Sequence, residues 1–325
     1  MTGIASKPAA SDGVTPSQAE RFASDLARLG PEDGRLGLAV SGGPDSLALL
    51  LLAHAAIPGR FAVATVNHGL RPEAADECAM VERVCTDRGI ACAVLQVELA
   101  AGNLQAEARE ARYAALAQWA GREGLAALAT AHHADDQAET LVMRLNRASG
   151  LAGLAGVRAR GIVPGAALPL LRPLLAWRRA ELAAIVANAG LEPARDASNA
   201  DEAYDRVRIR KALAGADWLD VEAIAASAGH LADADEAIEW MVERDWADNV
   251  SVADGGLHYQ PGAPRAVALR VVERIVGGFG GNARGGAIAR LVEGLEAGTG
   301  GNVAGVAAKV VGGVWLFRPE PPRRT

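Results

Sequence analysis

The sequence is poor in cysteine, in long apolar runs and in excess positive charge, and each shortage excludes a class of protein. Its three cysteines, Cys78, Cys85 and Cys92, form no Cys-x-x-Cys pair, which predicts reduced thiols in a cytosolic protein rather than a disulfide framework. No apolar run reaches the roughly 20 residues of a membrane span. The net charge of −6 argues against a protein that coats nucleic acid without specificity.

The N-terminal segment, residues 1–16, lacks the apolar core of a signal peptide and is expected to be a loose tail. We therefore expect a cytoplasmic protein with no membrane partner. The 325 residues exceed one ordinary domain, and a hydrophobic content of 50% is ample for a sizeable core. Two domains are expected, over residues 17–215 and 216–325.

Predicted strands alternate with predicted helices through the first domain. This alternation is typical of a parallel sheet with helices on both faces, so we predict an α/β fold with a doubly wound, mostly parallel sheet. After a first helix over 17–29, the predicted strands are 36–41, 61–66, 90–97 and 125–131, and the predicted helices are 45–56, 72–89, 104–121, 135–147 and 177–190.

The second expected domain is smaller and mixes helices with strands. A helix over 220–247 is followed by a hairpin over 250–259, which turns at Asp254-Gly255-Gly256. Two helices are predicted within 264–296, and strands that turn at Gly312-Gly313 within 303–317. The pattern predicts an α+β domain.

Six residues join the first predicted strand to its helix: Ser41-Gly42-Gly43-Pro44-Asp45-Ser46. At such a junction the backbone N–H groups and the helix dipole favour an anion, and glycines let the backbone approach a ligand closely. The simpler alternative is a corner in which Asp45 or Ser46 caps the helix.

Lysine is scarce as well, since it occurs only at Lys7, Lys211 and Lys309. A Walker-type phosphate loop needs a lysine directly after its second glycine, and none of the three lies near this loop. Any phosphate held here must be neutralised by backbone N–H groups, arginines and Mg²⁺.

A second polar motif, His132-His133-Ala134-Asp135-Asp136-Gln137-Ala138-Glu139-Thr140, follows the fourth predicted strand. If the helix begins near Asp135, then Asp136 and Glu139 share one face and can hold Mg²⁺ or an ammonium group. Acids are also favoured in any first helical turn, which does not explain the paired histidines. A transition-metal site is the other alternative, but the spacing fits no familiar zinc pattern.

A third motif, Asn67-His68-Gly69-Leu70-Arg71, follows the second predicted strand. Its polar groups suit the edge of a nucleotide base, or simply a polar loop. Because ligands bind at the carboxyl ends of parallel strands, the three motifs are expected to meet in one crevice.

The order and spacing of the three motifs resemble those of the tRNA(Ile)-lysidine synthetases, members of the ATP-pyrophosphatase (PP-loop) superfamily with its adenine nucleotide alpha hydrolase-like fold. Three later stretches resemble further motifs of that family: the Arg/Gly-rich residues 144–156, Arg172-Pro173-Leu174-Leu175, and Asp196-Ala197-Ser198-Asn199. The likeness is strong over 36–211 and is one of order and length over 212–325.

The resemblance implies an ATP-dependent ligase. It implies that ATP adenylates the C2 oxygen of the wobble cytidine of the CAU-anticodon isoleucine tRNA, and that the side-chain amine of L-lysine then displaces AMP to give lysidine. The implied partners are that tRNA, ATP and L-lysine, with a homodimer left open.

The resemblance also implies roles for individual residues. Ser41, Gly42, Gly43, Pro44, Asp45, Ser46, Asn67 and His68 are expected to bind ATP, with Asp45 near Mg²⁺ and Asp45, His132 and Asp136 as catalytic residues. Arg112, Asp136 and Glu139 are expected to bind lysine. Arg112 suits a carboxylate, and its helical neighbours one turn earlier, Ala108 and Arg109, are no partners for it.

A tRNA partner needs basic surface, and positive charge is concentrated after the catalytic motifs. Residues 144–211 hold 12 Arg and Lys against 6 Asp and Glu, as nucleic-acid recognition requires. Where the family usually has asparagine, this chain has Val207. Trp177 and Tyr204 are candidates for base stacking or for the core. The arginines expected to bind tRNA are Arg144, Arg147, Arg206, Arg208 and Arg210.

Two other functions stay open at this point. A tRNA thiolase of the same superfamily is disfavoured because many of them use a cysteine pair that this chain lacks. A nucleotide-binding sensor without chemistry would not need the acidic pair, Arg112 or the arginine-rich block.

Overall fold

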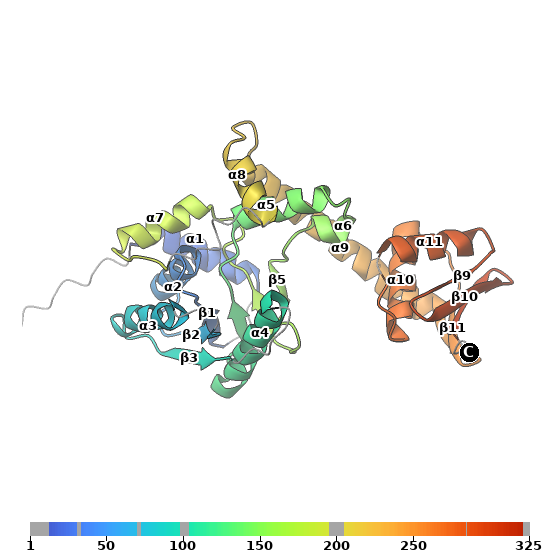
Figure 1. Ribbon diagram of the computed structural model, residues 1–325, viewed down its shortest axis with the longest axis horizontal. Coiled ribbons are helices and arrows are strands. Elements are labelled where there is room, and N and C mark those ends of the chain that lie inside the picture. Colours follow the sequence, from blue (N-terminus) through green and yellow to red (C-terminus); the bar gives the residue numbers. More distant parts are fainter. Residues whose placement is uncertain are drawn as a thin grey trace, which may run out of the picture. The chain divides into compact units, whose positions relative to one another are not determined.

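The computed structural model describes residues 13–30, 34–69, 73–97, 104–194, 205–283 and 285–320 (Figure 1). The chain forms two compact units, Met1–Ala232 and Asp233–Thr325, whose boundary falls within one long helix, α9 (Val221–Asn249). The domain limits predicted from the sequence, 17–215 and 216–325, remain a prediction.

The first unit is built on a six-stranded sheet with the order β3-β2-β1-β4-β6-β5. All neighbouring strands are parallel except β5, which is antiparallel to β6. This confirms the predicted fold class. The strands are β1 (Leu36–Ala39), β2 (Phe61–Asn67), β3 (Cys92–Gln96), β4 (Ala127–Ala129), β5 (Arg160–Ile162) and β6 (Pro169–Leu171).

The strand order reverses at β1, and this reversal positions the functional site. The chain runs outward from β1 to β2 and β3, then returns to place β4 on the other side of β1. Leu36 is therefore paired with Phe61 of β2 and with Ala127 of β4. The loops that leave β1 and β4 diverge at such a switch point and open a crevice at the carboxyl ends of the strands.

Helices cover both faces of this sheet. The helices that precede α9 are α1 (Pro16–Arg28), α2 (Pro44–Ala56), α3 (Glu73–Thr86), α4 (Leu104–Glu123), α5 (Ala134–Leu145), α6 (Leu151–Leu154), α7 (Arg179–Asn188) and α8 (Asp205–Ala214). Since side chains alternate across a strand, Phe61 and Val63 pack into a core with α1, α2, α3 and α7. Ala62 and Ala64 face the opposite core, which α4 covers (Figure 1).

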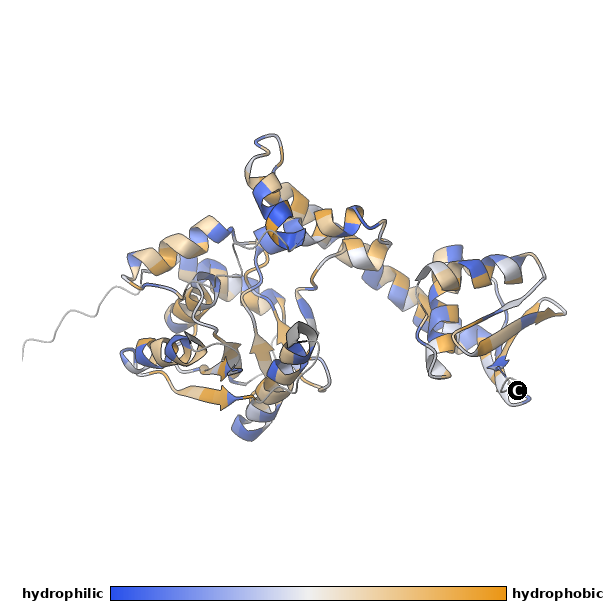
Figure 2. Ribbon diagram, viewed as in Figure 1, coloured by the Kyte–Doolittle hydropathy of each residue, from blue (hydrophilic) through white to orange (hydrophobic). Residues whose placement is uncertain are grey.

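Helix α2 is the central helix of the first core. Every residue from Ser46 to Ala53 is buried, so α2 is apolar on all sides, as expected for a helix enclosed by other elements. The strands of the sheet are likewise hydrophobic, whereas α5 and α8 carry a hydrophilic surface (Figure 2). The site is therefore attached to a rigid apolar element at α2 and to a charged one at α5 and α8.

Residues 13–16 and the aromatic residue Trp177 are both more firmly packed than a loose tail and an exposed ring would be. Residues 1–12 of the expected loose tail lie outside the described residues, but 13–16 are not loose, because Val14 packs on the core and Thr15 caps α1. Trp177 is a core residue: it is fully buried, and its Nε1 donates to Asp25 Oδ2 at 2.8 Å. Tyr204 lies outside the described residues.

The second unit has its own core. An antiparallel sheet with the order β7-β8-β11-β10-β9 packs against α10 (Arg265–Gly278) and α11 (Gly285–Glu296), with Tyr259 and Trp315 in edge-to-face contact at 5.6 Å. This confirms the α+β prediction. The strands are β7 (Val250–Ala253), β8 (Gly256–Tyr259), β9 (Gly301–Val303), β10 (Val306–Val311) and β11 (Val314–Pro319).

Cys78, Cys85 and Cys92 are free cysteines, and Cys78 and Cys85 are buried. Within the described ranges, no helix is both long and apolar enough to cross a lipid bilayer.

Candidate active site

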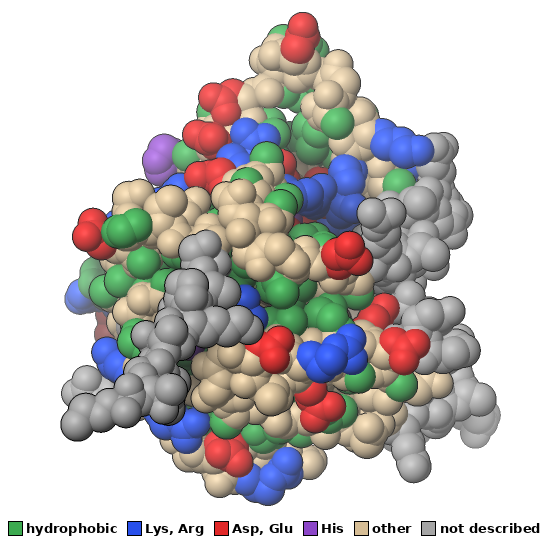
Figure 3. All heavy atoms as spheres, turned by 90° about the vertical axis from the view of Figure 1, so that its left-hand side faces the viewer, with side chains coloured by type: hydrophobic (Ala, Val, Ile, Leu, Met, Phe, Trp, Pro, Cys, Tyr) green, Lys and Arg blue, Asp and Glu red, His purple; other side chains and the backbone are tan. Residues whose placement is uncertain are grey.

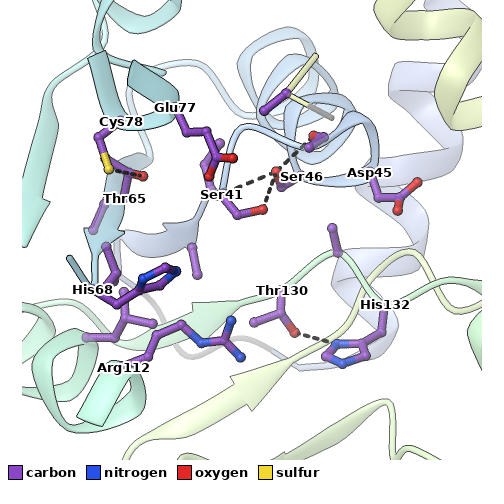
Figure 4. A pocket seen from close by; sticks show the side chains of 18 of the residues that line it. Ser41, Asp45, Ser46, Thr65, His68, Glu77, Cys78, Arg112, Thr130 and His132 are labelled. Carbon is purple, nitrogen blue, oxygen red and sulfur yellow. Dashed lines mark hydrogen bonds between the residues drawn. The ribbon is translucent and has the colours of Figure 1, made fainter. Parts of the chain in front are cut away.

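A cavity of about 440 Å³ lies at the carboxyl ends of β1, β2 and β4. Ser41 and Asp45 come from the loop after β1, His68 from the end of β2, and His132 from the segment after β4 (Figure 4). Asp136, from the same segment as His132, also lines the cavity. The crevice expected from the three motifs is therefore present.

The loop after β1 is held in shape by its own serines. Ser46 Oγ accepts from the backbone N–H of Ser41 at 3.2 Å and donates to the carbonyl of Gly43 at 3.0 Å. Gly42 has φ +86°, and its carbonyl accepts from the N–H of Ala194 at 3.0 Å. Gly42 thus makes the turn, and it faces Met80 rather than the cavity.

Gly43 has a different task. It is the N-cap of α2, has an ordinary φ of −72°, and no side chain caps the helix there. A Cβ at Gly43 would meet only Ser41 Oγ, at 3.8 Å, so this side of the loop is open towards the cavity. An uncapped helix N terminus next to a cavity is a ready-made anion site.

Asp45 carries a buried carboxylate oxygen, Oδ1, that has no hydrogen-bond partner among the described residues. Its other oxygen lies 3.4 Å from His133 Nε2. An unpartnered buried carboxylate oxygen beside an anion site fits a ligand of Mg²⁺, which binds proteins through one or two carboxylates together with phosphate oxygens. In the part of the chain that the structure describes, no group of three His, Cys, Asp or Glu side chains is arranged to hold a metal ion.

His133 fixes the start of α5. Its Nδ1 accepts from the backbone N–H of Asp136 at 3.3 Å, while Asp136 Oδ2 accepts from the N–H of His133 at 3.2 Å. Because Nδ1 is an acceptor, the proton of a neutral ring is on Nε2, which lies 3.4 Å from Asp45 and 3.6 Å from Asp136. His133 therefore spaces the two carboxylates, a role that the sequence did not indicate.

Glu139 is at the centre of a junction between three helices. Its side chain, 2% exposed, accepts from Arg179 of α7 at 3.1 Å and from Arg206 and Arg210 of α8, each at 2.8 Å through Nε. Arg206 also donates to Asp136 Oδ1 at 3.0 Å. The acid pair expected to bind an amine already holds protein cations.

Burial alone would raise the pKa of Glu139, but the hydrogen bonds from Arg210 and Arg206 outweigh it and hold that pKa below its ordinary value. Asp136, 16% exposed, lines the cavity. Of the pair, Asp136 thus presents its carboxylate to the cavity, and Glu139 anchors α7 and α8 to α5.

The wall opposite these acids is positively charged. Arg112 of α4 lines the cavity, with its guanidinium 5.6 Å from the ring centre of Tyr113. His132 Nδ1 lies 3.0 Å from Thr130 Oγ1. Burial and the nearby Arg172 charge lower the pKa of His132 to about 3, so His132 is a neutral hydrogen-bonding group at physiological pH.

Other predicted site residues lie outside the cavity. Asn67 makes a local turn, since its Oδ1 accepts from the N–H of Gly69 at 3.0 Å. Arg147 and Arg208 both pair with Asp205 at the start of α8. Val207 is buried, so the position that usually carries an amide packs inward. Residues 70–72 and 195–204, which include Arg71 and the Asp196–Asn199 motif, lie outside the described residues.

The arginine-rich block is therefore less free than its charge count suggests. Arg178 pairs with Asp135, and Arg160 donates to the carbonyls of Leu29 and Gly30. On the face shown in Figure 3, basic side chains are interspersed with acidic ones. Arg144 is exposed, and the role of the block in tRNA binding remains a prediction.

Comparison with known proteins identifies the family. A model described as the PP-loop domain matches residues 15–216. The tRNA(Ile)-lysidine synthase of Novosphingobium aromaticivorans is 53% identical over 311 residues, which cover 94% of this chain and 95% of that protein. The chain belongs to the tRNA(Ile)-lysidine synthase family.

Another tRNA(Ile)-lysidine synthase, from Zymomonas mobilis, is 40% identical over 301 residues, covering 90% of this chain and 91% of that protein. Among solved structures, the U34-tRNA thiolase NcsA from Methanococcus maripaludis, which has a [4Fe-4S] cluster, matches with a TM-score of 0.55 and 16% identity over 66% of this chain and 77% of that one. That likeness shows a shared fold. The family assignment comes from the sequence matches, which are to lysidine synthases.

The two loop glycines predict different failures. Gly42→Ala should destabilise the fold by about 1–3 kcal/mol, because a Cβ is strained at positive φ. Gly43→Ala should leave the unfolding free energy nearly unchanged, because its Cβ would meet only Ser41 Oγ at 3.8 Å. It should weaken ATP binding about tenfold, because the methyl group keeps a phosphate from the close approach that a charge-assisted hydrogen bond to the backbone requires. Urea unfolding measures the stability of each variant, and calorimetric titration measures its Kd for ATP. If both variants bind ATP as tightly as wild type, the assignment of the loop to ATP binding is wrong.

The Glu139 junction predicts a pH dependence of stability. A carboxyl group whose pKa is lowered by folding stabilises the protein above its unfolded pKa, and that contribution disappears as the pH falls below about 5. Glu139→Gln should cost about 3–5 kcal/mol at pH 7, because three guanidiniums lose a buried counter-charge, and should flatten the acid-side loss. Asp205→Asn, at an exposed ion pair, is the control and should change little. Parallel pH profiles of the unfolding free energy for Glu139→Gln and wild type would contradict this account.

Proposed function

We propose that the protein ligates L-lysine to C2 of the wobble cytidine of the CAU-anticodon isoleucine tRNA. The observation that carries the proposal is the cavity itself, where an uncapped helix N terminus, a free carboxylate oxygen of Asp45 and the carboxylate of Asp136 meet, in a chain that matches a lysidine synthase over nearly its whole length. A tRNA substrate and ATP make the cytoplasm the proposed location. A homodimer is left as an untested proposal.

The first half of the proposed reaction uses the loop. Ser41, Gly43, Pro44 and Ser46 surround the phosphates of ATP, and Gly42 shapes the turn. The C2 oxygen of the cytosine attacks the α-phosphorus, the bond between the α-phosphorus and the bridging oxygen breaks, and pyrophosphate leaves. Asp45 would hold Mg²⁺, which supplies neutralisation of the phosphate charge where no lysine is present. His68 lies beside the nucleotide. Asn67 contributes indirectly, by forming the turn that follows β2.

The second half uses the acid pair. The neutral side-chain amine of lysine attacks C2, the bond from C2 to the adenylated oxygen breaks, and AMP leaves, while the proton that the nitrogen loses passes to the carboxylate of Asp136, which lines the cavity. Asp136 and Glu139 bind the amine, which takes the place of a guanidinium. Arg206 is the one to leave, because it bridges both acids and is 43% exposed, against 31% for Arg179 and 29% for Arg210.

Two side chains on the remaining walls complete the site. Arg112 takes the lysine carboxylate, for which its planar guanidinium is suited. His132 contacts substrate or phosphate as a neutral donor. The proposed tRNA contacts of the arginine-rich block are Arg144, Arg147, Arg206, Arg208 and Arg210. Arg206 and Arg210 become available to RNA when lysine or tRNA loosens their ion pairs with Glu139.

The direct test is transfer of labelled lysine. With ATP and Mg²⁺, label should enter the wobble cytidine of the CAU-anticodon isoleucine tRNA, and AMP and pyrophosphate should appear in equal amounts. Methionine tRNA, which shares that anticodon, is the control and should stay unlabelled. Absence of transfer under these conditions would refute the proposal.

Asp136→Asn separates the two halves of the site. Its amide keeps the size of the side chain but loses the charge that an ammonium group needs. Lysine transfer should fall at least about a hundredfold, the cost of a charge-assisted contact in a partly buried site, while the Kd for ATP should change less than about threefold. Equal losses in both measurements would mean that Asp136 serves ATP rather than lysine.

A further inference from the structure

A group of three guanidiniums, which we call the α4 arginine cluster, surrounds Tyr113 on the wall opposite the acids. Arg109 and Arg112 lie over the Tyr113 ring, at 5.1 and 5.6 Å from its centre. Arg172, directly after β6, contributes the third. Tyr113 is 2% exposed and lines the cavity, so its ring provides a fixed seat for the two α4 arginines.

The α4 arginine cluster differs from the arginines that meet α5 in having no carboxylate partner among the described residues. Arg178, Arg179, Arg206 and Arg210 all pair with carboxylates of α5. Within the described ranges, no carboxylate pairs with Arg109, Arg112 or Arg172; Arg172 Nη1 donates to the Arg158 carbonyl, and its Nε is buried without a partner.

The electrostatic consequences show in the neighbouring groups. Burial lowers the pKa of Arg112; Tyr113 opposes this shift, and the Arg109 charge adds to it. Burial and the Arg109 charge also lower the pKa of Arg172, against the opposing effect of Tyr113, to which Arg172 is hydrogen-bonded. Arg172 and Arg109 both disfavour protonation of His132. Like charges held together without a counter-ion cost folding free energy, and such a cluster beside a cavity is a site for anions.

The proposed reactants leave much of this charge unmatched. In the proposed function, the ATP phosphates are held at the loop after β1, and lysine brings one carboxylate, assigned to Arg112. Arg109 lies one turn of α4 before Arg112, is exposed to solvent, and has its guanidinium over the ring of Tyr113, which lines the cavity. The remaining anion that must reach this side of the cavity is the backbone of the nucleic acid whose base enters the cavity.

We propose that Arg109 binds a backbone phosphodiester of the RNA substrate next to the nucleotide that enters the cavity. The ring of Tyr113 holds the Arg109 guanidinium in place, and Arg112 and Arg172 add to the positive electrostatic potential that attracts the phosphate. The RNA strand is then held at two places, the α4 arginine cluster and the arginines of α8. This proposal rests on the proposed function for the identity of the RNA, and its test reads binding rather than lysidine formation.

The test measures binding of the CAU-anticodon isoleucine tRNA by fluorescence anisotropy at several salt concentrations. Arg109→Gln should raise the Kd about tenfold and reduce the slope of log K against log salt by about one. Arg109→Lys keeps the charge and should keep the slope. Arg122→Gln is the matched control, since Arg122 is exposed on the same helix, about 20 Å further along it, and it should bind tRNA as wild type does.

The KM values for ATP and lysine should be unchanged in Arg109→Gln. An unchanged Kd and salt slope would overturn the proposal. So would a higher KM for lysine or ATP with normal tRNA binding, because the cluster would then serve a small anion. If wild type and Arg109→Gln differ in tRNA binding but neither makes lysidine, the proposed function fails while this contact stands.

Discussion

The carboxylate of Glu139 is the interaction on which the catalytic unit depends. It is nearly inaccessible to water, yet it receives three arginines from two other helices. A buried charge of this kind is tolerated only when it is fully paired. The same pairing therefore fixes α7 and α8 against α5 and fills the place to which a substrate amine is expected to come. Under the proposed function, the arginines and the substrate amine would compete for one carboxylate pair.

Different interactions hold the two ends of the site: apolar packing at α2, and ion pairs at α5 and α8. At α2, an apolar helix enclosed on all sides carries an uncapped N terminus and a loop set by Gly42 and the two serines. This end is rigid and preorganised for phosphate. At α5 and α8, alignment comes from ion pairs between partly exposed arginines and two acids. This end can exchange one cation for another without disturbing the core, because the apolar packing lies elsewhere.

Much of this could be read from the sequence because local patterns determined it. The alternation of apolar runs gave the parallel sheet, and loops after strands one, two and four had to meet at one edge. Pairings distant in sequence could not be read in this way. Nothing local shows that Arg206 reaches Asp136 or Arg210 reaches Glu139, 70 and 71 residues away. The arginine-rich block therefore suggested more free positive charge than the fold leaves.

Single residues show the same limit. Trp177 was a candidate both for base stacking and for the core, and its hydrogen bond to Asp25, 152 residues distant, shows that it belongs to the core. Tyr113 carried no signal beyond its place next to Arg112, although its ring organises the α4 arginine cluster. Arg179 was missed because its role depends on where α7 packs.

The central claim is that the arginines of α8 occupy the amine site and that a substrate amine replaces Arg206. Calorimetric binding of L-lysine to Arg206→Gln without tRNA tests it most directly, with Arg208→Gln, which alters the same helix but only the Asp205 pair, as the control. The account predicts that Arg206→Gln lowers the Kd for lysine and that Arg208→Gln leaves it as in wild type. Weaker lysine binding by Arg206→Gln would contradict the account, because Arg206 would then help to hold the amino acid rather than stand in its place.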